Sequence, residues 1–125
     1  MDQATLVNLD VSAGLKVLNA LDGARIEVAA ALWLVSADYD DWRLVISSPS
    51  LDQTHLRKAH EQVAEALHHR FVYLRPPILI LPVKDPFIRE LRRMFGKTSD
   101  VTGMRLGGQT IGNRFVSDAY VYRIQ

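Results

Sequence analysis

The chain has no cysteine among its 125 residues, which excludes disulfide bonds and zinc sites with cysteine ligands. It also lacks a long apolar run, because the longest, Val28 to Val35, is far too short to cross a bilayer. The first ten residues, MDQATLVNLD, have neither the basic start nor the apolar segment of a signal peptide. We therefore expect a soluble cytoplasmic protein that does not contact a membrane.

The composition is that of a globular protein, with 48% hydrophobic and 23% charged residues. A chain of this length can bury a core, and we expect a single domain over residues 1–125. The net charge is only +1, yet residues 1–65 hold five Lys or Arg against ten Asp or Glu, and residues 66–125 hold ten against four. This polarity would suit an anionic partner or head-to-tail self-association, or it is scatter.

Residues 31–49, ALWLVSADYDDWRLVISSP, place an acidic segment, DYDD, between two runs of alternating apolar side chains. Alternation with a period of two predicts a β-hairpin in which Trp33 opposes Ile46 and both tryptophans share one face. The acidic residues then form the turn, where Asp is favoured because it bonds nearby backbone amides. A calcium loop would need a glycine and a later glutamate that this segment lacks.

Helical periodicity recurs in three other segments. A first helix, capped by Asp10 or Ser12, ends at Asp22-Gly23, where we expect the glycine to be left-handed. A second helix runs from Ser50 to about Arg70. A third begins at Asp85-Pro86 and stops at Gly96. The residues expected to be buried in these helices are Leu15, Leu18, Leu21, Leu56, Ala59, Val63, Ala66, Leu67, Phe87, Ile88, Leu91, Met94 and Phe95.

Two further segments are predicted strands. ILILPV, residues 78–83, has the continuous apolar character of a strand buried on both faces. The segment 104–124 is predicted to form a second hairpin with Gly112-Asn113 as its turn. The predicted fold class is therefore α+β, in the order helix, strand, strand, helix, strand, helix, strand, strand. We expect a mixed sheet of about five strands with two hairpins, a parallel crossover and helices packed on it.

Catalytic motifs are incomplete wherever they begin. HEQVA at His60 resembles a zinc motif, but Ala64 stands where the second histidine is required. The stretch 103–110, GMRLGGQT, resembles a phosphate-binding loop, but Gln109 replaces its lysine and a hairpin turn follows instead of a helix. The sequence predicts no catalytic residue, no metal ligand and no cofactor, and the balance is against an enzyme.

A basic and aromatic set in the C-terminal half is the candidate binding surface. If the second hairpin pairs regularly across its turn, it directs Phe115 inward and Arg, Tyr and other polar side chains outward. Such residues bind phosphates and stack on unpaired bases, but arginines and tyrosines also make ordinary helix-end and cation–π contacts, and the tyrosines would equally suit a position under a helix or in a subunit contact. The predicted binding residues are Arg89, Arg92, Arg93, Lys97, Arg105, Arg114, Tyr120 and Tyr122.

Three framework segments, ALW, WRLVISSP and DAYVYRI, resemble those of a group of small bacterial proteins without an assigned activity. The similarity extends from Leu15 to Ile124. Because these segments build hairpins and contain no recognisable site, no functional residue can be transferred. The resemblance implies a bacterial cytoplasmic source.

Three hypotheses follow. The first is a non-catalytic binding or assembly module that self-associates, since hairpin edges and tyrosine-rich faces suit a homodimer. The second is a nucleic-acid-binding module that uses the basic and aromatic set. The third is a metal-dependent hydrolase that combines Asp38, Asp40 and Asp41 with a histidine brought near by folding.

Overall fold

The computed structural model describes residue 6 and residues 8–36, 41–68, 70–71 and 75–125. It is a mixed α+β structure, as the sequence predicts. Its elements are α1 (Asn8–Gly23), β1 (Ala30–Ser36), β2 (Arg43–Ser47), α2 (Pro49–Asp52), α3 (Leu56–Ala66), β3 (Ile78–Ile80), α4 (Pro86–Phe95), β4 (Arg105–Leu106), β5 (Gln109–Ile111) and β6 (Arg114–Ile124).

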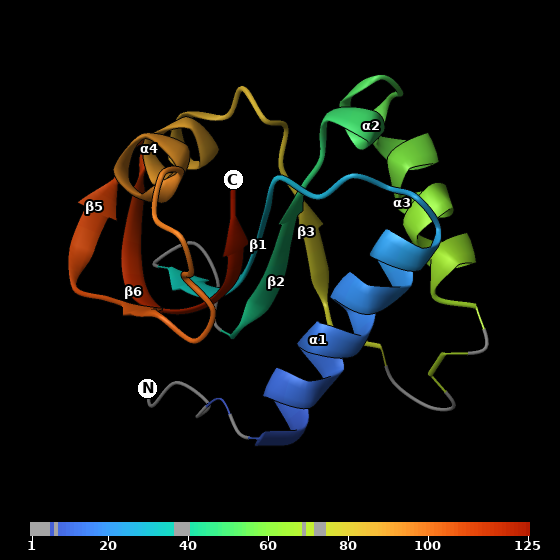
Figure 1. Cartoon of the computed structure of the whole chain (residues 1–125), viewed down its shortest axis with the longest axis horizontal. Helices are drawn as coiled ribbons and strands as arrows, with labels where there is room; N and C mark the ends of the chain where they lie inside the picture. The colour runs from blue at the N-terminus through green and yellow to red at the C-terminus, as the bar shows by residue number, and fades with distance from the viewer. Residues whose placement is uncertain (1–5, 7, 37–40, 69, 72–74) are drawn as a thin grey trace.

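The strands form one mixed sheet in the order β3-β2-β1-β6-β4, with β5 also paired to β6. β2 and β3 are parallel, as the strand–helix–strand succession predicts, and the other described pairs are antiparallel. In Figure 1, α1 and α3 lie together on one side, whereas α4 lies near β5 and β6. The described part of the sheet ends at β3 on one edge and at β4 and β5 on the other.

Each face of the sheet has its own hydrophobic core. Trp33, Leu44 and Ile46 face α1 and α3, and alternate residues such as Leu32 and Val45 face α4. β1 is buried along its whole length. Its side chains therefore point alternately into one core and into the other, and none of its faces is directed to solvent. The predicted common face of the two tryptophans is confirmed, because both belong to the α1–α3 core.

The register of the first hairpin differs from the predicted one by two residues. Trp33 opposes Leu44, and Ala31 opposes Ile46. A shift of two keeps every side chain on its face, because side chains alternate with a period of two. Burial therefore matches the prediction although the pairing partners do not.

The predicted helix from Ser50 to Arg70 is two helices, α2 and α3. Ser48, rather than Ser50, caps α2: its hydroxyl oxygen accepts from the backbone N–H of Ser50 at 3.1 Å. Thr54 then donates its hydroxyl to the carbonyl of Leu51 at 3.2 Å, and His55 is extended. A hydroxyl bonded to the backbone in this way competes with helix continuation. The predicted cap of α4 is confirmed, with Asp85 accepting from the Phe87 N–H at 2.9 Å.

Three helical residues predicted to be buried are exposed. Leu15 is 47% exposed, Leu56 59% and Met94 37%. Leu15 and Met94 lie at the margins of their apolar stripes, whereas Leu56 lies within its stripe as the first residue of α3. At the end of α1, the left-handed residue is Arg25, with φ of 62°, and not Gly23. None of the described helices is long and apolar enough to cross a membrane.

Candidate functional site

Tyr122 is part of the core and not of the predicted outward set. It is 6% exposed, donates its hydroxyl to the carbonyl of Val11 at 2.6 Å, and accepts from Trp33 Nε1 at 3.0 Å. Burial is the main cause that raises the pKa of Tyr122 to about 12. The hydroxyl therefore ties α1 to the sheet, and the prediction of an accessible Tyr122 is wrong.

An irregularity in β6 and the position of α1 explain why the predicted faces of this strand fail. Ser36 pairs with Val116 and Val35 with Asp118, so Ser117 is an extra residue on β6. Such a bulge reverses the faces on either side of it. Phe115 is consequently 47% exposed instead of buried. Tyr122 does lie on the face of Tyr120, opposite Ala119 and Val121, as alternation predicts, but α1 covers this face of the sheet.

The bulge also separates Arg114 from Arg105. Arg114 opposes Ile111, which belongs to the core beside α4, whereas Tyr120 packs against the other core. Arg105 opposes Tyr120, bonds Asp118 at 2.5 Å, and places its guanidinium 6.0 Å from the Trp42 ring centroid. The two arginines therefore lie on opposite faces of the sheet.

The basic residues of α4 form a third location. Arg89, Arg92, Arg93 and Lys97 are all exposed, on or just beyond the helix that covers the core opposite Arg105. Arg93 pairs with Glu90, and Arg92 donates to the carbonyl of Gln125 at 2.6 Å. The eight predicted binding residues do not form one surface. A binding role for those that are exposed stays a prediction.

The acidic turn offers little evidence for a metal site. Asp38 and Asp40 lie outside the described residues. Asp41 is exposed, and its carboxylate accepts from the Trp42 N–H at 2.7 Å, as expected for a turn residue. Among the residues that the structure describes, no three His, Asp or Glu side chains are grouped to hold a metal ion.

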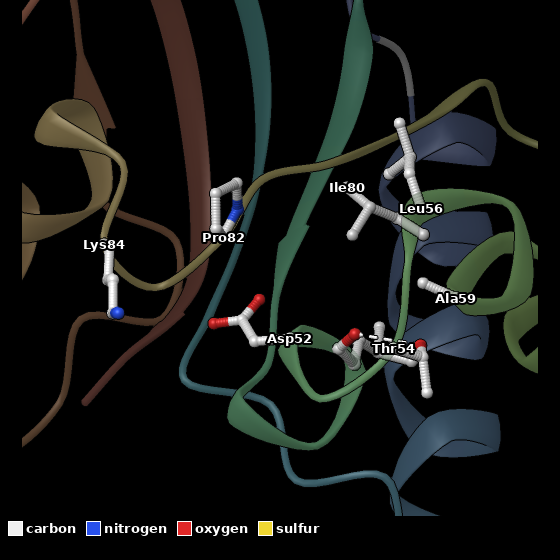
Figure 2. Close-up of a pocket in the computed structure, with 8 residues that line it drawn as sticks. Asp52, Thr54, Leu56, Ala59, Ile80, Pro82 and Lys84 are labelled. Carbon is white, nitrogen blue, oxygen red and sulfur yellow. Dashed lines mark hydrogen bonds between the residues drawn. The ribbon is translucent and has the colours of Figure 1, made fainter.

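A groove between α3 and β3, which the sequence did not predict, has the features of a binding site. Its first part is a hollow of about 400 Å³ beyond the carboxyl ends of the parallel strands β2 and β3. Figure 2 shows Ile80 lying toward Leu56 and Ala59, with Asp52 and Lys84 on the side of Pro82. The lining residues are Leu51, Asp52, Thr54, Leu56, Ala59, Ile80, Pro82 and Lys84.

A second hollow, of about 310 Å³, follows along the same junction of α3 and β3. It lies beside Ile78, as the first lies beside Ile80. Both isoleucine side chains point to the α3 face of the sheet, where they pack against the core. The lining residues are His60, Val63, Ala64, Leu67, Arg75, Pro76 and Ile78. We call the two hollows together the α3–β3 groove.

Within the described part of the chain, the backbone of β3 is hydrogen-bonded on one side only. The Leu44 N–H donates to the Pro77 carbonyl at 2.8 Å, and the Leu81 N–H donates to that of Ile46 at 3.1 Å. Because backbone groups alternate in direction along a strand, the N–H and C=O groups of Ile78 and Ile80 point outward. No described strand pairs with this outer edge.

Prolines limit the outer edge at both ends. By the same alternation, Pro76 and Pro82 occupy the outward positions before Ile78 and after Ile80. Proline has no N–H to donate to a neighbouring strand. The edge therefore offers two donors, which suffice for a short strand and oppose open-ended sheet association.

The groove is apolar inside and cationic at both ends. Lys84 lies at the first hollow, and Arg75 with His60 at the second; within the described part of the chain none of the three has an ion-pair partner. Asp52 also lines the first hollow, where its carboxylate accepts from the Val83 N–H at 2.8 Å and, among the described ion pairs, does not pair with Lys84. This distribution favours a ligand with acidic groups outside an apolar centre.

The sequence did carry signals of this groove. Pro76-Pro77 before ILI and Pro82 after it are typical of an edge strand, whereas the apolar content favoured a central one. The exposure of Leu56 had no signal, because its spacing fits the buried stripe.

No protein-family model, no curated protein and no solved structure matches this chain.

Proposed function

We propose that this protein is a binding module that captures an extended segment of a partner protein in the α3–β3 groove. The segment adds a strand to the outer edge of β3 and places alternate side chains in the two hollows. This mode of recognition combines backbone hydrogen bonds for affinity with side-chain pockets for specificity. The proposal retains the binding module predicted from the sequence and gives it a different surface.

One observation carries the proposal: the outward N–H and C=O groups of Ile78 and Ile80 lie beside apolar hollows. The free N–H and C=O groups of a strand edge can bond to water, so an edge alone does not indicate a binding site. An apolar hollow alone would indicate only imperfect packing. Their coincidence supplies both polar and apolar contacts to one extended chain. Leu56, 59% exposed on the wall of the first hollow, gains burial when the groove is filled.

A second copy of this chain fits the edge poorly. Antiparallel pairing of two β3 strands about Leu79 would set Pro76 opposite Pro82 of the other copy. It would also bring Arg75 of one copy near Lys84 of the other, and like charges at an interface oppose association. A partner with the opposite charge is therefore the favoured occupant, and self-association stays a prediction for other surfaces.

A display library of random linear peptides, selected on the immobilised protein, tests the proposal. Selected peptides should bind the wild type and bind Leu56→Arg at least about 10-fold more weakly, because the new side chain fills the first hollow with charge. Leu15→Arg is the matched control, since Leu15 is a half-exposed helical leucine outside the groove. Its affinity should equal that of the wild type.

Hydrogen exchange locates the bound segment. Binding should slow the exchange of the Ile78 and Ile80 amides and leave those of β4 and β5 unchanged. The proposal is wrong if selection yields no binder, if binders ignore Leu56→Arg, or if protection appears at β4 and β5. Light scattering measures the oligomeric state as a further test. If the wild type is a dimer and Leu56→Arg is a monomer, the groove binds a second copy of this chain and not a partner protein, and the proposal is wrong.

A further inference from the structure

We infer that the segment bound in the α3–β3 groove has two apolar side chains separated by one residue, with acidic residues on both sides of this core. The inference rests on the proposed function and specifies its ligand. It draws on the positions of the hollows and on the charges at the ends of the groove.

The spacing of the apolar side chains follows from β3. Ile78 and Ile80 are two residues apart, and each borders one hollow. Residues of an added strand directly opposite them point to the same face, toward α3. Two such residues lie about 6.7 Å apart along a strand, which matches the repeat of β3 itself. The intervening side chain points to the opposite face, beside Leu79, and avoids both hollows.

The prolines set the length of the core. Because Pro76 and Pro82 offer no outward N–H, a bound segment can accept backbone bonds only from Ile78 and Ile80. The residues beyond this short ladder depart from the strand and pass the ends of the groove. These are the positions whose side chains meet Lys84 at one end and Arg75 with His60 at the other.

The charge of the flanking residues follows from what surrounds these cations. Asp52 lines the first hollow but accepts from the Val83 N–H and does not pair with Lys84 among the described ion pairs, and Glu61 on α3 pairs with Arg57 at 3.5 Å. Acidic residues of the ligand therefore meet cations that have no ion-pair partner among the described residues. Exposed pairs of this kind increase selectivity and the rate of association, and salt weakens them.

Three capped synthetic peptides test the inference by fluorescence anisotropy. The first has the core Leu-Thr-Leu between Glu-Glu flanks, the second has the same core between Lys-Lys flanks, and the third has Leu-Thr-Thr-Leu between Glu-Glu flanks. At low salt the first should bind at least about 10-fold more tightly than the second, and added salt should narrow this difference. It should also bind about 10-fold more tightly than the third, whose second leucine is turned to the opposite face.

Charge reversal provides the decisive control. In the double variant Arg75→Glu with Lys84→Glu, the preference between Glu-flanked and Lys-flanked peptides should invert, and both substitutions are on exposed residues. Equal binding of all three peptides to the wild type would overturn the inferred ligand while leaving strand capture intact. No binding of any of them would also overturn it, and the library selection with Leu56→Arg then decides separately whether the groove binds peptides.

Discussion

β3 lies at one edge of the sheet, and β4 and β5, which both pair with β6, lie at the other. The two edges expose backbone groups in different surroundings. β3 borders two apolar hollows and is limited by prolines. β4 and β5 are separated by Gly107 and Gly108, and the hollow at the β5–β6 turn is lined by Pro86, Arg89, Glu90, Arg93, Gly112 and Asn113. Strand addition requires apolar volume beside free backbone groups, and among the described residues we find this combination at the β3 edge.

The largest effect on stability is expected from Gly112→Ala, which tests how firmly the β5–β6 turn is held. Gly112 has φ of +60°, and an added Cβ would collide with the carbonyl of Pro86 at the start of α4. We expect the free energy of unfolding to fall by about 3 kcal/mol in urea titrations. Gly108→Ala, with φ of +66° and no atom near the added Cβ, should cost only about 1 kcal/mol. Equal losses would mean that the turn is not anchored on α4.

Tyr122→Phe should have the next largest effect, because it acts where β6 joins α1. The substitution leaves the buried Trp33 Nε1–H and the Val11 carbonyl without their shared partner. A loss of about 2 kcal/mol in the free energy of unfolding is expected from urea titration. A loss below about 0.5 kcal/mol would show that water replaces the hydroxyl and that this junction is open.

The contribution of Tyr122 should also depend on pH. Its folded-state pKa is about 12 against an ordinary value of 10.0, so the unfolded chain releases this proton first. The stabilisation is therefore complete below pH 10 and is lost as the pH rises to about 12. The difference in unfolding free energy between wild type and Tyr122→Phe should decrease across this window. A difference independent of pH would contradict the assigned burial.

Asp22→Asn should have a small effect, because it removes an exposed pair between α1 and β6. Nη1 and Nη2 of Arg123 each donate to one carboxylate oxygen of Asp22 at 2.9 Å, and this hydrogen bonding lowers the pKa of the Asp22 carboxyl. The loss at pH 7 should be about 0.5 kcal/mol by thermal denaturation. It should disappear in acid, because a group with a lowered pKa loses its contribution as the pH falls through the folded-state value. Glu27→Gln is the control and should behave as the wild type at both pH values.

Leu56→Arg should have the smallest effect on stability and the clearest effect on recognition. Leu56 is 59% exposed, so its replacement should change the free energy of unfolding by less than about 0.5 kcal/mol. The same variant should lose peptide binding. A large loss of stability would place Leu56 in the core and remove the distinction between the two edges.

Much of the fold was predictable from alternation and local chemistry. The common face of Trp33 and Trp42, the Asp85 cap and the Gly112-Asn113 turn depend on neighbouring residues, and all three are confirmed. The failures concern bulges and margins. The bulge at Ser117 places the side chains of Phe115 and Arg114 on the faces opposite to those predicted. Nothing near Ser117 in the sequence indicates a bulge, because the bulge arises from the pairing of β6 with β1, which is far away in the sequence.

The candidate site was the least predictable part, since its components are not neighbours in the sequence. The ILI segment and its prolines were visible as residues, but their significance depended on which strand lay beside them.

The sequence by itself determined the α+β class, the Asp85 cap and the Gly112-Asn113 turn, because these follow from periodicity and backbone bonding within a few residues. Only the tertiary structure decided that β3 lies at an edge, that Tyr122 is buried under α1, and that α3 stands beside β3 to form a groove. Strand order and helix placement depend on how separate apolar faces are shared between two cores, and no single segment contains that information.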